Sequence, residues 1–408
     1  MIDIKHLREH PDIFRQSATL RGITVDIDAV LKADKKRVEL IGQVDQLRAE
    51  LNVKGKPDAA RLKQLQTAKA KLEPLEDQLA NTEERFQELM QAVPNLLAPE
   101  TPEGGEGDSR QEKTWGKAEP QREFKDHLTL AEAKGWLDFE RGAKVAGSKF
   151  YFTRGALVKL ELALQSMLYP MLEERGFTLM QVPHLASTRI MNGTGFNPRG
   201  NEDQIYRVED QDLNLIATAE IPLTGYHADE IIDPTQLPLM YAGFSPAYRL
   251  EAGAYGAISK GLYRVHQFNK LEMYVFCQDS ESEHWHQELI KIEEEICQRL
   301  ELPYRLLRIA SGDLGASAYK KYDLEYWSPV DMAYRELTSC SNCTDYQARR
   351  LNIRTRNADG KPVFVHTLNG TAAAFSRLPI AIMDNYQTRD GEVRVPKALQ
   401  SYYGADKL

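Results

Sequence analysis

Cysteine is scarce in this sequence, and long apolar runs are missing. Only four cysteines occur in 408 residues, which argues against a disulfide-stabilised secreted scaffold and favours a reducing, cytoplasmic setting. No apolar run approaches the ~18 residues that a membrane-spanning helix needs, and the first residues, MIDIKHLREHPD, lack the apolar core of a signal peptide. Net positive charge is also lacking, since the formal net charge is −8. Any nucleic acid must therefore be bound by a local basic patch.

The cysteines do not form a recognisable zinc motif. Cys340 and Cys343 make a CxxC pair in TSCSNCTD, but no second pair or paired histidines lie nearby in the sequence. A structural zinc site needs four ligands, and a lone CxxC is weak grounds for one. Cys277 and Cys297 stand alone and are expected to be buried, unreactive thiols.

The composition is otherwise that of a soluble globular protein, with 42% hydrophobic and 27% charged residues. A chain of this length can form two or three domains around a substantial core. GxGxxG and P-loop motifs are absent. A Rossmann or Walker-type nucleotide site is therefore not expected.

Residues 244–276 predict two neighbouring strands joined by a loop. Side chains of the same parity share one face of a strand, and here that face is polar instead of apolar. Two adjacent strands would thus present arginines, an aromatic ring and carboxylates to one surface, where a functional site is expected. The residues concerned are Arg249 and Glu251 on the first strand, and Arg264, Phe268, Lys270 and Glu272 on the second.

This combination of side chains suits a nucleotide. The ring offers a stacking surface for a base, and guanidinium groups offer forked donors for phosphate oxygens. The plainer alternative is a surface hairpin with salt bridges, because perturbed or paired charges are often structural. The residue types alone do not decide between the two.

Two heptad patterns in the N-terminal third predict an antiparallel coiled-coil hairpin. Apolar residues recur in steps of three and four over residues 30–51 and again over 65–93, on either side of the turn NVKGKPD. A helix of ~25 residues projects about 38 Å. Pro74 lies inside the second pattern and is expected to kink that helix or mark a restart.

One part of this hairpin is strongly basic. Residues 54–71 hold six basic residues and a single acidic one, Asp58, a local charge of +5. A solvated coiled-coil face is one interpretation, and a grip on the backbone of a helical RNA is the other. The basic residues are Lys54, Lys56, Arg61, Lys63, Lys69 and Lys71.

The pattern predicts an α+β protein with three parts. Residues 1–100 form a helical domain with the coiled-coil arm. Residues 101–125 form a linker, because prolines and the run GGEGD replace the apolar periodicity there. Residues 126–408 form a mixed domain of helices and strands. Within it, Thr218 and Glu220 are expected on one face of a short extended segment.

YRLEAG followed by RVHQFNKLEMY resembles motif 2 of class II aminoacyl-tRNA synthetases, in its seryl-tRNA synthetase version. The resemblance extends over nearly the whole chain. It includes the N-terminal arm, the helix and strand of residues 155–185 (motif 1), the TAE segment, ELTS, and HTLNGTAAAFSRLP (motif 3). It implies an antiparallel sheet flanked by helices.

The resemblance also implies the site residues. The catalytic arginines would be Arg249, on the α-phosphate, with Arg264 and Arg377 on the outer phosphates. Phe268 would stack on adenine, Glu251 would belong to the ATP site, and Glu336 and Ser339 would hold Mg²⁺ with ATP. Serine would be bound by Thr218, Glu220, Arg249, Glu272, Asn369 and Thr371. The tRNA would contact Lys54, Lys56, Arg61, Lys63 and Lys69.

The implied activity is a serine–tRNA ligase that forms seryl-adenylate from serine and ATP and then loads tRNA(Ser). The resemblance leaves open whether tRNA(Sec) is also served, and it implies a cytoplasmic homodimer formed through motif 1. Alternatives are a class II paralogue that loads a carrier protein and a non-catalytic RNA-binding relative. Two features depart from the family pattern: a short arm tip, and Ala372 and Ser376 where glycine is common, which would add atoms near the nucleotide.

Overall fold

The computed structural model describes residues 1–52, 58–120, 123–196, 205–251 and 260–408. The chain divides into two compact units, Met1–Leu96 and Leu97–Leu408. Taken together, the two units confirm the predicted α+β class, because the first is a helical arm and the second contains a large sheet.

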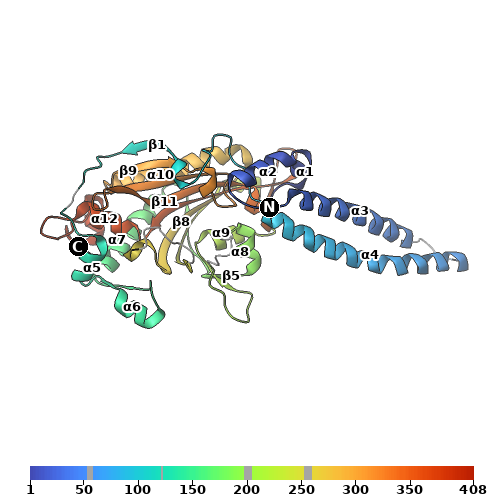
Figure 1. The fold of residues 1–408 in the computed structure, drawn as a ribbon, viewed down its shortest axis with the longest axis horizontal. Coiled ribbons are helices and arrows are strands. Elements are labelled where there is room, and N and C mark those ends of the chain that lie inside the picture. The colour runs from blue at the N-terminus through green and yellow to red at the C-terminus, as the bar shows by residue number, and fades with distance from the viewer. Residues whose placement is uncertain (53–57, 121–122, 197–204, 252–259) are drawn as a thin grey trace. The chain divides into compact units, whose positions relative to one another are not determined.

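The first unit consists of two short helices and two long ones. The short pair is α1 (Ile4–Glu9) and α2 (Pro11–Leu20), and the long pair is α3 (Ile27–Leu51) and α4 (Ala59–Ala92), which lie side by side as a hairpin (Figure 1). Asp26 and Asp58 cap the long helices by accepting hydrogen bonds from the third backbone N–H that follows each. The heptad prediction is confirmed, because the buried residues include Val30, Leu40, Val44, Ala68 and Phe86.

Pro74 lies within one continuous helix, so of the two expected outcomes, a kink or a restart, the restart is wrong. Its side chain is exposed, and only the backbone bond that its missing N–H would have made is lost. Cooperative hydrogen bonding and packing on either side carry α4 through that gap.

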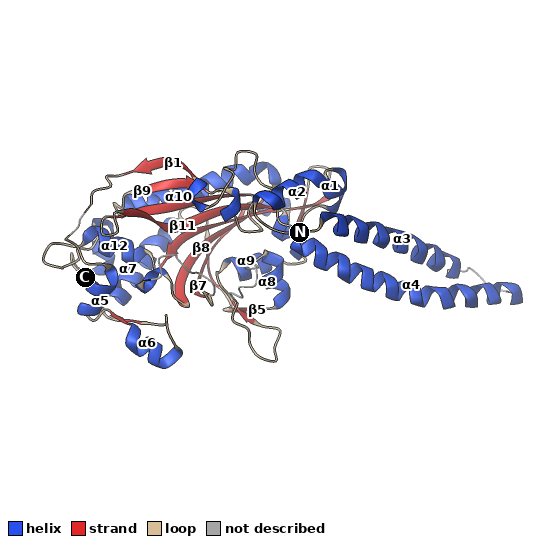
Figure 2. Ribbon diagram, in the orientation of Figure 1, coloured by secondary structure: helices blue, strands red, loops and turns tan. Residues whose placement is uncertain are grey.

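The second unit is built on an eight-stranded sheet with the strand order β1-β9-β10-β11-β14-β8-β7-β4 (Figure 2). Neighbouring strands are antiparallel except β4 and β7, which are parallel. The strands are β1 (Arg110–Trp115), β4 (Thr178–Gln181), β7 (Leu239–Tyr248), β8 (Gln267–Cys277), β9 (Tyr304–Arg308), β10 (Lys320–Ser328), β11 (Ala333–Thr344) and β14 (His366–Ala374).

Residues 101–125 are not a simple linker, which corrects the expectation from composition. Arg110–Trp115 forms β1, the edge strand of the sheet, and pairs with β9 over Arg110↔Arg308 to Trp115↔Tyr304. Most of its side chains are exposed. The strand therefore lacks an apolar face, and its partner is nearly two hundred residues away in sequence, so no local pattern marked it.

Helices and short strands cover the sheet. The helices are α5 (His127–Ala133), α6 (Phe139–Ala146), α7 (Ala156–Glu173), α8 (Thr188–Thr194), α9 (Glu220–Gly225), α10 (Ser282–Arg299), α11 (Tyr346–Leu351), α12 (Leu378–Tyr386) and α13 (Gln400–Tyr403). The short strands are β2 (Leu137–Asp138), β3 (Phe152–Thr153), β5 (Leu185–Ala186), β6 (Asn214–Leu215), β12 (Arg354–Arg356) and β13 (Pro362–Phe364).

Strand β8 separates two apolar clusters. Leu271, Met273 and Val275 belong to a cluster with residues of α7, α10 and α12. Tyr274 and Phe276, of the opposite parity, belong to a second cluster with residues of α8, α9 and α11. Both faces of this strand are therefore buried, which explains why neither parity reads as a simple half-exposed strand.

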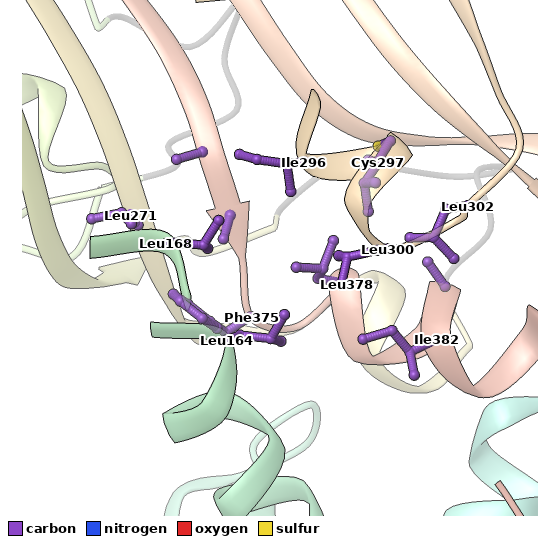
Figure 3. Close-up of a cluster of buried hydrophobic side chains, with 14 of the residues drawn as sticks. Leu164, Leu168, Leu271, Ile296, Cys297, Leu300, Leu302, Phe375, Leu378 and Ile382 are labelled. Atoms are coloured by element: carbon purple, nitrogen blue, oxygen red, sulfur yellow. The ribbon is translucent and has the colours of Figure 1, made fainter. Parts of the chain in front are cut away.

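Figure 3 shows the first cluster, where side chains from α7, α10, α12 and β8 converge. Burying one such leucine contributes about 1.5–3 kcal/mol relative to leaving it exposed. This packing fixes the sheet from behind and leaves the polar residues of its other face to form a site. The labelled residues are Leu164, Leu168, Leu271, Ile296, Cys297, Leu300, Leu302, Phe375, Leu378 and Ile382.

Candidate active site

A polar pocket of about 230 Å³ lies at the ends of β7 and β8 and along β10, β11 and β14. It brings together nine residues that the sequence singled out: Arg249, Glu251, Phe268, Lys270, Glu336, Ser339, Thr371, Ser376 and Arg377. Its other lining residues are Tyr263, Val265, Lys321, Leu337, Thr338 and Ala374.

Arg249 and Phe268 lie together in this pocket. Strands β7 and β8 pair in register up to Tyr248↔Gln267, and the backbone N–H of Arg249 donates to His266 O at 3.0 Å. The guanidinium carbon of Arg249 is 5.3 Å from the centre of the Phe268 ring. At this distance the guanidinium is within the range of a cation–π interaction with the ring.

Glu251 and Arg264 form an ion pair at 2.7 Å, but the strand parity that predicted their shared face does not apply. Strand β7 ends at Tyr248, and Glu251 has a positive φ of 50°, which turns the chain away from extended geometry. Arg264 precedes β8 and follows the short 3₁₀ helix Gly261–Tyr263. Arg264 does not line the pocket itself, and reaches it through Glu251.

Glu336 and Arg377 form the ion pair of the opposite wall. The guanidinium of Arg377 is 3.0 Å from Glu336 Oε1 and also donates to Glu336 O at 3.2 Å. Burial opposes ionisation of Glu336, but the charges of Arg377, Lys321 and Arg249 outweigh it and lower its pKa to about 2. This carboxylate is therefore ionised at any physiological pH.

A bulge in β11 lets Glu336 and Ser339 share the pocket although they are three residues apart. On β10, Leu324 pairs with Thr338 and the next residue pairs with Glu336, so Leu337 is the extra residue. One additional residue reverses the alternation of side chains. Two side chains that carry oxygen atoms are thereby brought to one surface.

Glu272 lies beneath the pocket instead of lining it. Only 1% of this residue is exposed, and burial raises the pKa of its carboxyl. Its carboxylate contacts Lys270 and accepts a hydrogen bond from Thr218 Oγ1 at 3.2 Å. It is paired in the ladder with Thr371 of β14, so two predicted serine-site residues lie side by side.

Thr218 and Glu220 do not share an extended segment, which corrects the sequence prediction. Glu220 begins α9, and its backbone N–H donates to Thr218 Oγ1 at 3.3 Å. A threonine hydroxyl that accepts from the second residue on starts a turn instead of a strand. The two side chains nevertheless belong to one polar network, because Thr218 contacts Glu272 and Glu220 Oε1 accepts from Asn369 Nδ2 at 3.1 Å.

Glu220 has a raised pKa. Burial, and next the negative charge of Glu272, raise it to about 7. A carboxyl in this range changes its charge near neutral pH. Glu220 therefore differs in kind from Glu336, although both are glutamates of the same site.

Sequence reasoning named Lys270 on the polar face of its strand but gave it no role, and it missed Lys321 and Gln347. Lys270 and Lys321 line the pocket, and Lys321 Nζ lies 3.0 Å from Asp323. Gln347 of α11 is fully buried and donates to Glu220 Oε1 at 2.7 Å, and nothing in the local pattern marked it.

The two unusual positions of motif 3 have different surroundings. Ser376 lines the pocket, whereas Ala372 is fully buried in the apolar cluster behind the sheet and does not line the pocket. The expectation that both side chains add atoms beside the nucleotide thus applies to Ser376 alone.

Of the basic residues of the arm, Arg61, Lys63 and Lys69 lie on the first turns of α4. Lys63 and Lys69 are exposed, whereas Arg61 is partly buried and donates to Gln64 Oε1 and Glu50 O, each at 3.0 Å. Lys54 and Lys56 lie outside the described residues. Ala68 is buried on the side of α4 that faces α3, so the lysines project away from that interface.

All four cysteines are buried, and burial raises the pKa of Cys277 to about 12. Cys343 Sγ accepts from Asn369 Nδ2 at 3.8 Å. Among the described residues, no group of three or more histidine, cysteine or acidic side chains is arranged to hold a metal ion. Across the same residues, no helix has the length and hydropathy to cross a membrane.

Two family models match the sequence. Residues 206–386 match the tRNA synthetase class II core domain (G, H, P, S and T), and residues 1–97 match the seryl-tRNA synthetase N-terminal domain. The serine–tRNA ligase of Dictyoglomus turgidum is 47% identical over 100% of this chain and 99% of its own. This chain belongs to the seryl-tRNA synthetase family.

Further relatives agree with this assignment over the full length. The serine–tRNA ligase of Rubrobacter xylanophilus is 45% identical and also covers 100% of this chain. The crystal structure of seryl-tRNA synthetase from Pyrococcus horikoshii complexed with ATP superposes with a TM-score of 0.91 at 39% identity, covering 100% of this chain and 99% of the other. The cytoplasmic enzyme of Naegleria fowleri in complex with AMP gives a TM-score of 0.86 at 31% identity.

Proposed function

We propose that this serine–tRNA ligase forms its adenylate in the 230 Å³ pocket. The observation that carries this proposal is the joint lining of one pocket by two arginines, an aromatic ring and an ionised carboxylate, in a member of this family. Those groups suit the phosphates, the base and the counter-ion of ATP.

In the first step, the carboxylate oxygen of serine attacks the α-phosphorus of ATP. A P–O bond forms, the bond to the bridging oxygen breaks, and pyrophosphate leaves with the electron pair. The attacking carboxylate is already ionised, so no general base is needed, and positioning and charge neutralisation carry the catalysis. Arg249 contacts the α-phosphate, Arg377 contacts an outer phosphate, and Phe268 stacks on adenine beside Glu251. Arg264, which pairs with Glu251 and lies outside the lining of the pocket, reaches the outer phosphates once it leaves that pair.

Glu336 and Ser339 would hold Mg²⁺. The fit rests on their side-chain oxygens, which line the same pocket, and on the low pKa of Glu336, about 2. Magnesium prefers oxygen ligands and takes few from the protein, so ATP would supply others. When bound, the ion would neutralise charge on the departing pyrophosphate.

The serine pocket comprises Glu272, Thr218, Asn369, Thr371 and Glu220, with Arg249 at its border. Glu272 accepts a hydrogen bond from the hydroxyl of serine, and Glu220 from its ammonium group. Alanine is rejected because it leaves these buried polar groups unpaired, which costs far more than one missing contact. Threonine keeps the hydroxyl and must be excluded by shape.

In the second step, a hydroxyl of the 3′-terminal adenosine of tRNA(Ser) attacks the carbonyl carbon of seryl-adenylate, and AMP leaves. The arm binds the tRNA backbone through Lys54, Lys56, Arg61, Lys63 and Lys69. The local charge of +5 on an otherwise acidic chain supports this role. Whether tRNA(Sec) is a second substrate is decided by the charging assay below.

We also propose a cytoplasmic homodimer formed through α7 and β4. The exposed apolar residues of α7, Val158 and Leu162, support an interface there. Cys277, Cys297 and Cys340 form no disulfide, in keeping with a reducing compartment. The first 100 residues form the tRNA-binding domain, and the class II domain comprises residues 126–408 together with the preceding edge strand β1.

Two assays test this proposal. Serine-dependent ATP–pyrophosphate exchange should occur without tRNA, with alanine and threonine at least about 10²-fold poorer. Transfer to purified tRNA should follow, and tRNA(Sec) transcripts belong in the same assay. Exchange without charging would indicate a carrier-loading paralogue, and the absence of exchange would contradict the enzyme altogether.

The arm is tested by K63A/K69A, with R85A on the same helix as the matched control. Arg85 is also exposed but lies outside the basic stretch and pairs with Glu88. The double variant should keep normal exchange, raise the KM for tRNA, and lower the salt dependence of tRNA binding by roughly one unit of log–log slope per lost phosphate contact. Equal behaviour of the two variants would contradict the assignment.

A further inference from the structure

Gln347 of α11 joins four elements below the serine pocket. Its side chain is fully buried. The amide Nε2 donates to Thr194 O at 3.0 Å, at the end of α8, and to Glu220 Oε1 at 2.7 Å, on α9. Its Oε1 accepts from Tyr274 Oη of β8 at 2.8 Å and from Thr367 Oγ1 of β14 at 2.7 Å.

These four hydrogen bonds use the whole capacity of the amide, two donors and two acceptor positions. They also fix which way the amide points. In the reversed orientation its oxygen would face the Glu220 carboxylate and the carbonyl of Thr194, which are both acceptors. The orientation is therefore determined by the surroundings, and rotation would break every bond at once.

The network extends on both sides of Gln347. Thr224 Oγ1 lies 2.7 Å from Tyr274 Oη and 2.7 Å from the carbonyl oxygen of Glu220, one turn earlier on α9. Tyr274 and Thr367 are fully buried on neighbouring strands. The backbone and the carboxylate of Glu220 are thus held through the same set of side chains.

Only one oxygen of Glu220 is held in this way. Oε1 accepts from Gln347 and from Asn369 Nδ2, while Oε2 has no hydrogen-bond partner among the described residues. Nor does a lysine or arginine form an ion pair with Glu220 within that part of the chain, whereas Glu272 has Lys270. A largely enclosed carboxylate with neutral donors on one oxygen and no counter-ion suits a cationic ligand on the other.

We propose that Gln347 is a positioning residue for amino-acid binding, which holds Glu220 so that its Oε2 accepts a hydrogen bond from the ammonium group of the substrate. The inference rests on the proposed function, because it deepens the role of Glu220 in the serine pocket. Gln347 acts through Glu220 and touches no substrate atom itself.

The charges around Glu220 support a role for Gln347 in positioning it and a role for Glu220 in binding the ammonium group. Glu220 is faced by the charges of Glu272, Lys270 and Arg249, and its pKa is raised by burial and by Glu272 while the bond from Gln347 lowers it. Removing that bond should make Glu220 harder to ionise. The effect would appear in serine binding near neutral pH and not in ATP binding.

The main test is Gln347→Glu, which is nearly isosteric and keeps an acceptor for Tyr274 and Thr367. It replaces the donor toward Glu220 by a second carboxyl group, and two carboxyls in contact share one proton. In the ATP–pyrophosphate exchange assay, the KM for serine should rise by about 10- to 100-fold, because one hydrogen bond to a charged group is lost. The acid limb of kcat/KM for serine should move to higher pH, with the KM for ATP changed less than about twofold.

Gln387→Glu is the matched control. Gln387 is also buried and makes paired hydrogen bonds with the backbone N–H and carbonyl of Lys125, each at 2.9 Å. Its replacement removes the same kind of donor from a buried amide, away from Glu220. Both variants should lose thermal stability, but only Gln347→Glu should change the KM for serine and the pH profile.

Glu220→Gln distinguishes a failure of this inference from a failure of the proposed function. If Gln347 acts through Glu220, adding Gln347→Glu to Glu220→Gln should cause little further rise in the KM for serine. If Glu220→Gln leaves that KM unchanged, the role of Glu220 is wrong. If Glu220→Gln raises it and Gln347→Glu does not, the positioning role is overturned while the proposed function stands.

Tyr274→Phe provides a second route should Gln347→Glu fail to fold. It removes one of the two donors to Gln347 Oε1 and keeps the ring in the core. We expect a smaller rise in the KM for serine, about threefold, with the KM for ATP unchanged. Equal changes in both KM values, or no change in either, would contradict the inference.

Discussion

Two glutamates of the same site have opposite behaviour. Glu336 stands at the open wall of the pocket, where cations lower its pKa to about 2. Glu220 lies in the enclosed network behind it, where burial and Glu272 raise its pKa to about 7. The difference is set by the neighbouring charges and not by the side chain.

This contrast assigns different tasks to the two ends of the site. A carboxylate that is ionised at every physiological pH suits permanent pairing with arginine and metal. A carboxylate without its own counter-ion suits a substrate that brings the positive charge. The proposed phosphate end therefore contains the Glu336–Arg377 ion pair, whereas Glu220 at the proposed serine end accepts from neutral donors and lies near Glu272, which pairs with Lys270.

The largest effect is expected from Arg249→Ala at the phosphate end. Its guanidinium lies beside Phe268 in the pocket, and loss of a positioned donor to a transferring group costs about 10³-fold in rate. ATP–pyrophosphate exchange measures this loss, and thermal unfolding should change little. Arg335→Ala is the control. Arg335 lies on the same strand as Glu336 but pairs with Asp331 and does not line the pocket. Normal ATP–pyrophosphate exchange in Arg249→Ala would contradict the proposed role of Arg249.

The next effect is a dependence of serine use on pH. The pKa of Glu220 is raised to about 7, so the carboxylate is ionised above that pH and protonated below it. We expect kcat/KM for serine to fall by about tenfold per pH unit as the pH drops below 7. Glu336 stays ionised over this whole range, so the KM for ATP should change less. An unchanged acid limb in Glu220→Gln would contradict this assignment.

Phe268→Leu should have a smaller effect, confined to the nucleotide. Leucine keeps apolar bulk but removes the stacking face, which contributes about 0.5–1.5 kcal/mol. The KM for ATP should rise by roughly 2- to 10-fold, and the KM for serine should stay the same. A larger rise in the KM for serine than in the KM for ATP would indicate that Phe268 does not stack on the adenine base.

The smallest effect on activity is expected at Asp384, a buried carboxyl outside the pocket. It accepts from Ser328 Oγ at 2.6 Å and from Tyr326 Oη at 3.1 Å, and burial raises its pKa to about 7. The folded state therefore holds a proton that the unfolded chain has released above pH ~4, and the free energy of unfolding should decrease as pH rises from ~4 to 7.

Asp384→Asn should reduce that pH dependence of stability and leave exchange and charging unchanged. Urea unfolding at pH 5 and pH 7.5 measures the first effect. Asp384 and Glu220 share the same pKa, so this variant tests whether a raised pKa by itself implies function. A loss of exchange in Asp384→Asn would weaken the contrast between the two ends of the site.

Periodic features of the fold were predictable from the sequence because they are local. The heptads of the arm appeared as α3 and α4, and the polar alternation around Phe268 appeared as β7 and β8. The resemblance of YRLEAG and ELTS to family motifs then selected Arg249 and Glu336, which do line one pocket.

The remaining features depend on backbone irregularities and distant pairing. The positive φ of Glu251 and the helix start at Glu220 each break the parity on which the predictions rested, and the extra residue at Leu337 was not predicted. Strand β1 pairs with a distant strand and has no apolar face. Gln347 was invisible because its role depends on four elements that meet only in the folded chain.

The buried thiols have a practical consequence. Alkylating reagents attack thiolates, and burial raises the pKa of Cys277 and of Cys340 so that almost no thiolate forms at neutral pH. Cys340 follows Ser339 directly on β11. The rate at which Cys340 is alkylated therefore reports local unfolding of the strand that bears the proposed magnesium ligands. This rate should decrease when a bound nucleotide stabilises the folded strand.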